Sequence, residues 1–113
     1  METYVSLKAQ EFVTQFLNDE TAILLDVRTN SEYKKEHILG STLAPGIETI
    51  LNDFNKDKSY YLHCRVGGRC AIVAYKMVNA GFKNIYSLND NLDNMIVEFK
   101  KTNTHNFTLV KAA

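Results

Sequence analysis

The sequence predicts an α/β fold in which a central, mostly parallel β-sheet is flanked by helices on both faces. Two observations lead to this prediction. Segments typical of strands alternate along the chain with segments of helical periodicity, which is the order found in α/β sheets. The run "TAILLDV" at 21–27 is apolar without a polar alternation, as expected of a strand covered on both faces.

The first half of the chain is expected to begin with a helix within 6–19, where apolar side chains recur at helical spacing and Ser6 is a candidate N-cap. The apolar strand follows it. Thr29 and Glu32 then have the form of a capping box that opens a short helix. The half ends with two further elements, a short strand within 40–46 and a short helix at 47–55.

The second half is expected to contain the strand 59–64, a helix at 70–82, the strand 83–88 and an amphipathic helix at 91–101. Gly81 is a natural C-cap for the helix at 70–82. One face of that helix carries four small or apolar residues: Cys70, Ala74, Met77 and Val78.

A chain of 113 residues is long enough for one domain with a real core and too short for two. We expect this domain to span residues 1–101. Residues 102–113 are expected to form either a C-terminal tail or an added edge strand.

The composition limits the classes of function. Lys and Arg number 13 and Asp and Glu number 13, so the net charge favours neither nucleic acid nor membrane as a partner. The first residues lack the order of a secretory signal, and we therefore expect a cytoplasmic protein. The chain has two cysteines, Cys64 and Cys70. In a reducing compartment a stable disulfide is not expected, and two cysteines beside one histidine make a poor zinc site.

The loop that begins at Cys64 has the composition of an anion-binding site. It leads from a strand into a helix, whose N-terminus presents unpaired N–H groups. We expect Gly67 and Gly68 to allow positive φ angles and a close approach of the backbone, so that Arg65, Val66 and the glycines form a nest of N–H groups. Such surroundings lower the pKa of a thiol. The alternative is that Cys64 is a small buried residue before a tight turn.

Three segments together resemble the rhodanese family of sulfurtransferases. "LLDVRTNSEYKKEHILGS" at 24–41 resembles a family signature with Asp-x-Arg, an acidic–aromatic pair, His-Ile and Gly-Ser. "HCRVGGRC" at 63–70 resembles the active-site loop Cys-Arg-x-Gly-x-Arg-Ser, and "AGFKNIYSLNDNLDNM" at 80–95 resembles the closing segment. The resemblance extends from Val5 to about Lys100.

The resemblance implies that Cys64 carries sulfur as a persulfide. A small anionic donor such as thiosulfate or a persulfide would supply sulfane sulfur, and a thiol, a protein or cyanide would accept it, without a metal or an organic cofactor. Arg65 and Arg69 would attract the donor, unless they are solvated surface charges. Four residues are expected to hold the neighbouring loop as structural ion pairs or caps rather than to act chemically: Asp26, Arg28, Glu32 and His37.

Two departures from the family pattern bear on the site. Asp90 and Asn91 replace a Gly-Gly pair, and both tolerate left-handed backbone, so we expect the turn to persist. Cys70 stands where the family usually has Ser. Three interpretations of Cys70 remain open: it is a small helix residue, it forms a disulfide with Cys64 that releases the sulfur as sulfide, or it is a second site for sulfur or regulatory oxidation.

Two other functions remain possible from the sequence. Phosphatases and arsenate reductases related to this family use the same cysteine, but their loop is one residue longer than the six residues from Cys64 to Arg69. A non-catalytic binding module would typically have lost the cysteine. His63 is adjacent to Cys64 in sequence, yet adjacent strand residues point to opposite faces, so we expect a structural role for it.

Overall fold

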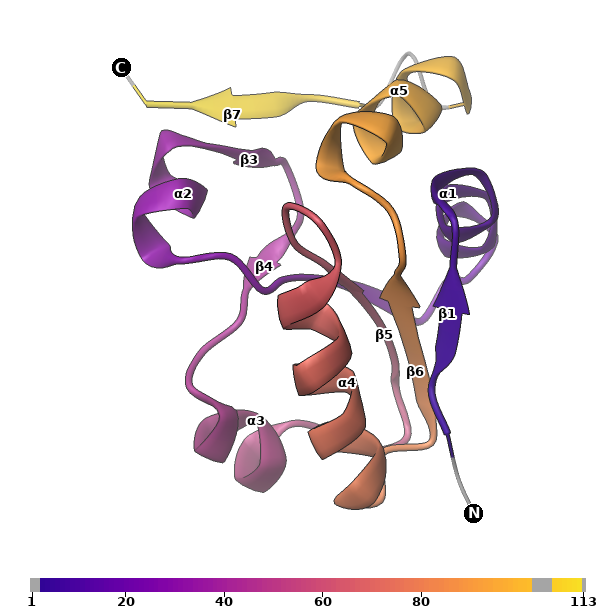
Figure 1. The fold of residues 1–113 in the computed structure, drawn as a ribbon, viewed down its shortest axis with the longest axis vertical. Helices are drawn as coiled ribbons and strands as arrows, with labels where there is room; N and C mark the ends of the chain where they lie inside the picture. The colour runs from indigo at the N-terminus through magenta and orange to yellow at the C-terminus, as the bar shows by residue number, and fades with distance from the viewer. Residues whose placement is uncertain (1–2, 103–106, 113) are drawn as a thin grey trace.

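The structure is a computed structural model, and it describes residues 3–102 and 107–112. Its centre is a five-stranded sheet with the order β1-β6-β5-β2-β4, in which all neighbouring strands are parallel. Figure 1 shows β1, β6 and β5 running side by side. The strands of this sheet are β1 (Val5–Leu7), β2 (Ala22–Asp26), β4 (Thr42–Leu43), β5 (Ser59–His63) and β6 (Asn84–Leu88).

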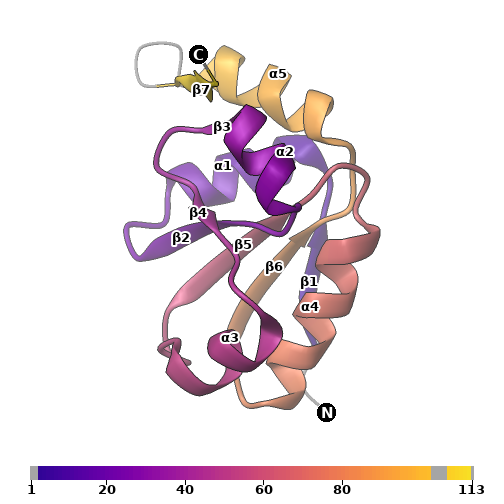
Figure 2. The ribbon, with the colours of Figure 1, turned by 90° about the vertical axis from the view of Figure 1, so that its left-hand side faces the viewer.

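The two faces of the sheet are covered by different helices, which confirms the predicted fold class. The helices are α1 (Ala9–Leu17), α2 (Asn30–Lys35), α3 (Ile47–Asp53), α4 (Gly68–Asn79) and α5 (Leu92–Thr102). Residues of α1 and α5 form one apolar core, and residues of α3 and α4 belong to the other. Figure 2 shows the pair α1 and α5 away from α3 and α4.

The central strand β5 explains why both faces need cover. All five of its residues are buried. Tyr61 packs in the core of α1 and α5, whereas Tyr60 and Leu62 pack in the core of α3 and α4. Cys64, the first residue after the strand, continues this alternation, because it also belongs to the core of α3 and α4. The strand therefore delivers Cys64 to the face on which α4 lies.

Helix ends confirm two of the sequence expectations. The Thr29 hydroxyl accepts a hydrogen bond from the Glu32 N–H at 3.2 Å, and the Glu32 carboxylate accepts one from the Thr29 N–H at 2.9 Å, which is the predicted capping box. Gly81 has a φ of +98° after the end of α4, and its N–H donates to Val78 O. This glycine ends the helix as predicted.

One expectation about a helix start is wrong, and the turn at Asp90 and Asn91 has a different basis from the expected one. Ser6 lies in β1, and the first N–H of α1, on Ala9, donates instead to the Asp90 carboxylate at 3.1 Å. No non-glycine residue in the described ranges has a positive φ, so Asp90 and Asn91 do not use the left-handed region. Their side chains accept hydrogen bonds instead: Asn91 Oδ1 accepts from the Asn94 N–H at 2.8 Å at the start of α5.

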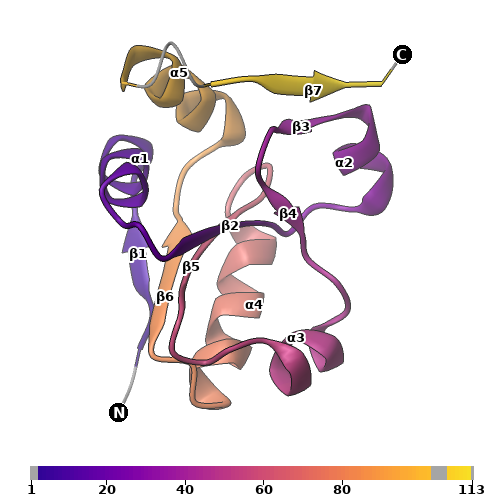
Figure 3. The ribbon, with the colours of Figure 1, turned by 180° about the vertical axis from the view of Figure 1, so that it is seen from behind.

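A second, two-stranded sheet joins distant parts of the chain. Strand β7 (Leu109–Lys111) pairs antiparallel with β3 (Glu36–Ile38). Figure 3 shows β7 crossing beside β3 and α2 on its way to the C-terminus. The sequence predicts neither β1 nor β3, and two residues of β1, Ser6 and Leu7, lie in the segment expected to form the first helix. Residues 103–106 and 113 of the expected tail lie outside the described residues.

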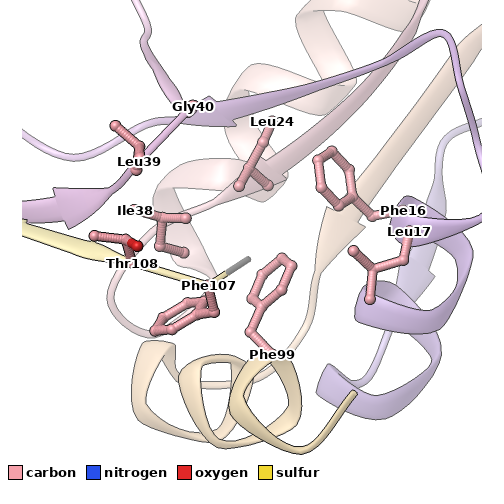
Figure 4. Close-up of a pocket in the computed structure, with 9 residues that line it drawn as sticks. All are labelled: Phe16, Leu17, Leu24, Ile38, Leu39, Gly40, Phe99, Phe107 and Thr108. Carbon is pink, nitrogen blue, oxygen red and sulfur yellow. The ribbon is translucent and has the colours of Figure 1, made fainter. Parts of the chain in front are cut away.

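An apolar pocket of about 110 Å³ lies on the sheet face of α1 and α5 (Figure 4). Its walls include Phe16, Leu24, Phe99 and Phe107. Because Cys64 packs in the opposite core, this pocket is not part of the cysteine site. In the described ranges no helix is long and apolar enough to cross a membrane.

Candidate active site

The candidate site lies at the carboxyl edge of the parallel sheet, where ligands bind in folds of this kind. Cys64 directly follows β5, and the loop from Cys64 to Gly67 leads into α4. The ends of β2 and β6 lie beside it, because these two strands pair with β5 on either side. Figure 1 shows this loop at the head of α4, below α5.

The Cys64 sulfur is surrounded by hydrogen-bond donors. Gly67 donates its backbone N–H to Sγ at 3.1 Å, and the Cys70 thiol donates to Sγ at 2.9 Å. The Cys70 thiol, together with the N–H groups of Cys70, Gly67 and Val66, outweighs the effect of burial and lowers the pKa of Cys64 to about 5. These donors therefore favour the thiolate form of Cys64.

Cys64 is also completely covered. Its exposed fraction is 0%, and that of Cys70 is 0% as well. Both cysteines are free. The hydrogen bond to the Cys64 thiolate, burial and the charge of that thiolate all raise the pKa of Cys70 above its usual value. The pair thus consists of one thiolate and one thiol in a closed space.

Gly67 is the glycine that the loop requires. It is the N-cap of α4 and has a φ of +96°, and a Cβ on it would lie 3.2 Å from the Leu88 carbonyl oxygen. Gly68 has no positive φ, and a Cβ on it would meet nothing within 4 Å. Of the two glycines expected to allow a positive φ, only Gly67 uses this freedom, whereas Gly68 is the first residue of the helix.

The end of β6 and the start of α5 fix the loop from the other side, and sequence reasoning missed both contacts. The Leu92 N–H donates to the Arg65 carbonyl at 3.0 Å, so that the first turn of α5 holds the loop. The Leu88 carbonyl occupies the space where a Cβ on Gly67 would lie, and it is 4.0 Å from Cys70 Sγ. The signal that could have found them is the pairing of the two strands, because parallel neighbours end at the same edge.

The two arginines of the loop have different surroundings. Arg69 forms a bidentate ion pair with Glu32, with N–O distances of 2.7 and 3.3 Å. This hydrogen bond is the main cause that lowers the pKa of Glu32 to about 2. Arg65 is exposed and forms no ion pair with another described residue. Arg65 is therefore the loop's uncompensated positive charge, and Arg69 links the loop to α2.

Asp26 and Arg28 form a buried ion pair behind the loop. The guanidinium contacts the carboxylate at 2.7 Å and at 2.9 Å, and it also donates to the Glu36 carbonyl at 2.7 Å. Burial alone would raise the pKa of Asp26, but the neighbouring His63 ring and Arg28 lower it below its usual value. The pair joins the end of β2 to β3. Asp26 and Arg28 therefore help to position the segments that lie beside the Cys64 loop.

His63 and His37 do not reach the sulfur. His63 is completely buried, its Nε2 lies 3.5 Å from Asp26 Oδ2, and neither ring nitrogen has a hydrogen-bond partner in the described part of the chain. The His37 ring stacks on Tyr33 at 3.7 Å, and its Nδ1 lies 2.8 Å from Tyr33 O. His63 thus lies beside Asp26 and His37 lies on Tyr33, and the hydrogen bonds to Cys64 Sγ come from Gly67 and Cys70 instead.

A polar hollow of about 650 Å³ adjoins the loop. Arg65 and Glu32 belong to its wall, whereas Cys64 does not. Charges of both signs line it: Arg28, Lys35, Arg65 and Lys111 against Glu32, Glu36 and Asp93. Among residues 3–102 and 107–112, no group of three or more His, Cys, Asp or Glu residues could hold a metal ion.

Comparison with known proteins adds an independent line of evidence. Residues 9–96 match the family model described as "Rhodanese-like domain". The chain is 34% identical over 86 residues to the "Putative sulfur carrier protein YrkF" of Bacillus subtilis, 32% identical over 89 residues to a tRNA uridine(34) hydroxylase of Photorhabdus laumondii, and 30% identical over 82 residues to a tRNA sulfurtransferase of Thermoplasma acidophilum.

These relatives are much longer than the chain. The matches cover 74%, 71% and 73% of the chain but only 45%, 25% and 17% of the respective relatives. The fold also matches a solved structure, the rhodanese-like domain of the Anabaena protein Alr3790, with a TM-score of 0.67 and 22% identity over 86% of this chain and 75% of that one. At this identity the solved structure supports the fold alone.

Proposed function

The chain belongs to the family of rhodanese-like domains, and from this premise we propose that it is a sulfurtransferase that carries sulfane sulfur as a persulfide on Cys64. The observation that carries the proposal is the hydrogen bonding of the Cys64 sulfur by Gly67 and Cys70, which favours its thiolate form. A thiolate is the form of cysteine that attacks sulfur. The name of the Bacillus relative, a sulfur carrier, agrees with this chemistry.

In the first step, the Cys64 thiolate attacks the outer sulfur of a donor such as thiosulfate. A bond forms between Cys64 Sγ and that sulfur, the S–S bond of the donor breaks, and sulfite leaves with the electron pair. The N–H groups of Gly67 and of the first turn of α4 stabilise the negative charge at the sulfur. Arg65, exposed and without an ion-pair partner among the described residues, supplies the attraction for an anionic donor.

In the second step, a thiolate or cyanide acceptor attacks the outer sulfur of the persulfide. The bond between Cys64 Sγ and the outer sulfur breaks, and its electron pair returns to Cys64 as the thiolate. Neither step needs a metal or an organic cofactor. The acceptor is a small thiol or a thiol on another protein, and the hollow beside Arg65 and Glu32 is where it would approach the loop.

Both steps require the loop to open, because Cys64 is 0% exposed. Val66, within the loop, is 76% exposed, so little of its surface is covered. The loop is short, and its two fixed points are the Arg65 carbonyl on α5 and the Arg69 ion pair on α2. The opening that admits a donor is therefore a movement of Val66 and Gly67 between these points.

The proposal is tested by thiocyanate formation from cyanide with thiosulfate as donor, measured above the rate without protein. We expect activity in the wild type and none in Cys64→Ser, since serine is not ionised at neutral pH and forms no persulfide. Hydrolysis of p-nitrophenyl phosphate, measured in parallel, distinguishes the phosphatase alternative. Thiocyanate formation that survives in Cys64→Ser, or phosphate release that this substitution abolishes, would contradict the proposal.

A further inference from the structure

Cys70 has no covalent role in the two steps above, although it carries the same reactive group as Cys64 and its sulfur contacts the Cys64 sulfur. It lies in the first turn of α4, and its Sγ is 2.9 Å from Cys64 Sγ. It is 0% exposed and packs in the same core cluster. A pair of cysteines at this distance is a candidate for chemistry between them rather than for two separate roles.

We propose that Cys70 resolves the Cys64 persulfide by forming a Cys64–Cys70 disulfide and releasing the outer sulfur as hydrosulfide. The chain then acts as a reductase of sulfane sulfur that depends on a dithiol. This inference rests on the proposed persulfide at Cys64 and adds a fate for its sulfur. It assigns the substrate class as sulfane sulfur compounds and the product as hydrosulfide.

The geometry requires little movement. Disulfide sulfurs are about 2.0 Å apart, so the two Sγ atoms need to approach by less than about 1 Å from their present distance. Both residues are connected by one short loop and the first turn of one helix.

The burial of the pair favours the internal reaction over transfer to an external acceptor. An external thiol reaches the sulfur on Cys64 only after the loop opens, because Cys64 is 0% exposed. Cys70 is already in contact with Cys64 in the closed loop. A reacting group held in place has a far higher effective concentration than a dissolved one, so the internal attack competes with transfer to an external acceptor and is favoured when the acceptor is scarce.

The step balances as a thiol–disulfide exchange. The Cys70 sulfur attacks the inner sulfur, Cys64 Sγ, and the bond between Sγ and the outer sulfur breaks. The outer sulfur leaves with the electron pair and takes the proton of the Cys70 thiol, so that hydrosulfide is released. Two cysteine sulfurs are oxidised to a disulfide, and the sulfane sulfur is reduced by two electrons. A dithiol reductant then returns both cysteines to thiols and closes the cycle.

The protonation of Cys70 fits this order of events. While Cys64 is a thiolate, its charge and hydrogen bond hold the proton on Cys70. In the persulfide the negative charge lies on the outer sulfur, so the hydrogen bond to a charged Sγ is lost. Cys70 is therefore inert before the sulfur is loaded and is released for attack once Cys64 carries it.

The test is a single loading with thiosulfate or tetrasulfide in the absence of any thiol, followed by alkylation, peptide mapping and measurement of sulfide. The variant is Cys70→Ser, in which a hydroxyl replaces the thiol but no disulfide is possible. We expect the wild type to contain the Cys64–Cys70 disulfide and to release one sulfide per chain on thiosulfate loading. We expect Cys70→Ser to accumulate a Cys64 persulfide and to release sulfide at least about tenfold more slowly.

The outcomes separate the two proposals. A wild type that retains a Cys64 persulfide beside a free Cys70 overturns the inference and leaves the proposed sulfur transfer intact, and this result needs no variant. Equal sulfide release by the wild type and Cys70→Ser also overturns it. If neither protein gains sulfur, forms a disulfide or releases sulfide with either donor, both proposals are contradicted.

Discussion

The Cys70 thiol donates a hydrogen bond to the Cys64 sulfur across 2.9 Å, and this contact is the main cause of the low pKa of Cys64. The two cysteines are six positions apart, one at the end of a strand and the other in the first turn of the following helix. Their contact decides which sulfur is charged: Cys64 is the nucleophile and Cys70 holds the proton. The predictions below start from this asymmetry.

The first prediction concerns the titration of Cys64. Its pKa of about 5 means that the thiolate forms as the pH rises through about 5 and is complete at neutral pH. The ultraviolet absorbance of the thiolate should therefore rise with a midpoint near 5 in the wild type, and Cys64→Ser should show no rise near this pH. Cys70→Ala removes the main donor, so its midpoint should move upward. A wild-type midpoint near the ordinary value of about 8.5 would contradict this account.

The second prediction compares the two adjacent glycines. Gly67→Ala places a Cβ on left-handed backbone and against the Leu88 carbonyl, and it should lower the free energy of unfolding by at least about 1–2 kcal/mol. It should also slow persulfide formation, because the Gly67 N–H contacts the sulfur. The matched control is Gly68→Ala in α4, which should be neutral or stabilising by up to about 1 kcal/mol. Denaturant unfolding of both variants measures the difference, and equal effects would refute it.

The third prediction concerns the ion pair between Glu32 and Arg69. Glu32→Gln removes the pair but retains a residue able to complete the capping box with Thr29. Because Arg69 is 42% exposed, solvent screens the pair, and the loss at neutral pH should not exceed about 1 kcal/mol. The matched control is Glu20→Gln, at an exposed position without an ion pair among the described residues.

The pH dependence of this third effect has a definite sign. Folding lowers the pKa of Glu32 from 4.5 to about 2, so its stabilising contribution is complete above about 4.5 and is lost as the pH falls toward 2. The difference between Glu32→Gln and the wild type should therefore shrink over this range. A difference that grows on acidification would show that the pair does not stabilise the charged form.

The fourth prediction concerns the buried pair of Asp26 and Arg28. Asp26→Asn leaves the Arg28 guanidinium buried without its counter-charge, and the expected cost is about 3–5 kcal/mol in the free energy of unfolding. Asp53→Asn, at the exposed end of α3, is the control and should change stability by less than about 0.5 kcal/mol. Thermal or denaturant unfolding measures both. A loss of less than 1 kcal/mol for Asp26→Asn would mean that the pair is not needed to hold the loop's neighbours.

The sequence was sufficient for features that depend on nearby residues. The capping box of Thr29 and Glu32 spans three positions, and the apolar face of α4 follows helical periodicity. Contacts between distant segments could not be predicted. The Ala9 N–H at the start of α1 donates to Asp90, 81 residues later in the chain, and not to Ser6. Glu32 and Arg69 form their ion pair although 37 positions separate them. Such pairs depend on how the strands are ordered in the sheet.

The site divides in the same way. The position of Cys64 at a strand end followed from the pattern of the chain, and its opposite orientation to His63 followed from strand geometry. The distance between the two cysteine sulfurs did not, because it depends on the path of the loop and on the φ of Gly67. Sequence alone could not distinguish Gly67 from Gly68, because only Gly67 has left-handed backbone that requires a glycine.

The central claim is that Cys64 carries the sulfur. Its most direct test is the intact mass of Cys70→Ser after exposure to thiosulfate or tetrasulfide, since this variant cannot discharge the sulfur into a disulfide. We predict the gain of one sulfur atom, located by peptide mapping on Cys64 and removed by cyanide, and no gain when Cys64 is also replaced by serine. A sulfur adduct that persists after this second substitution, or no adduct with either donor, would contradict the account.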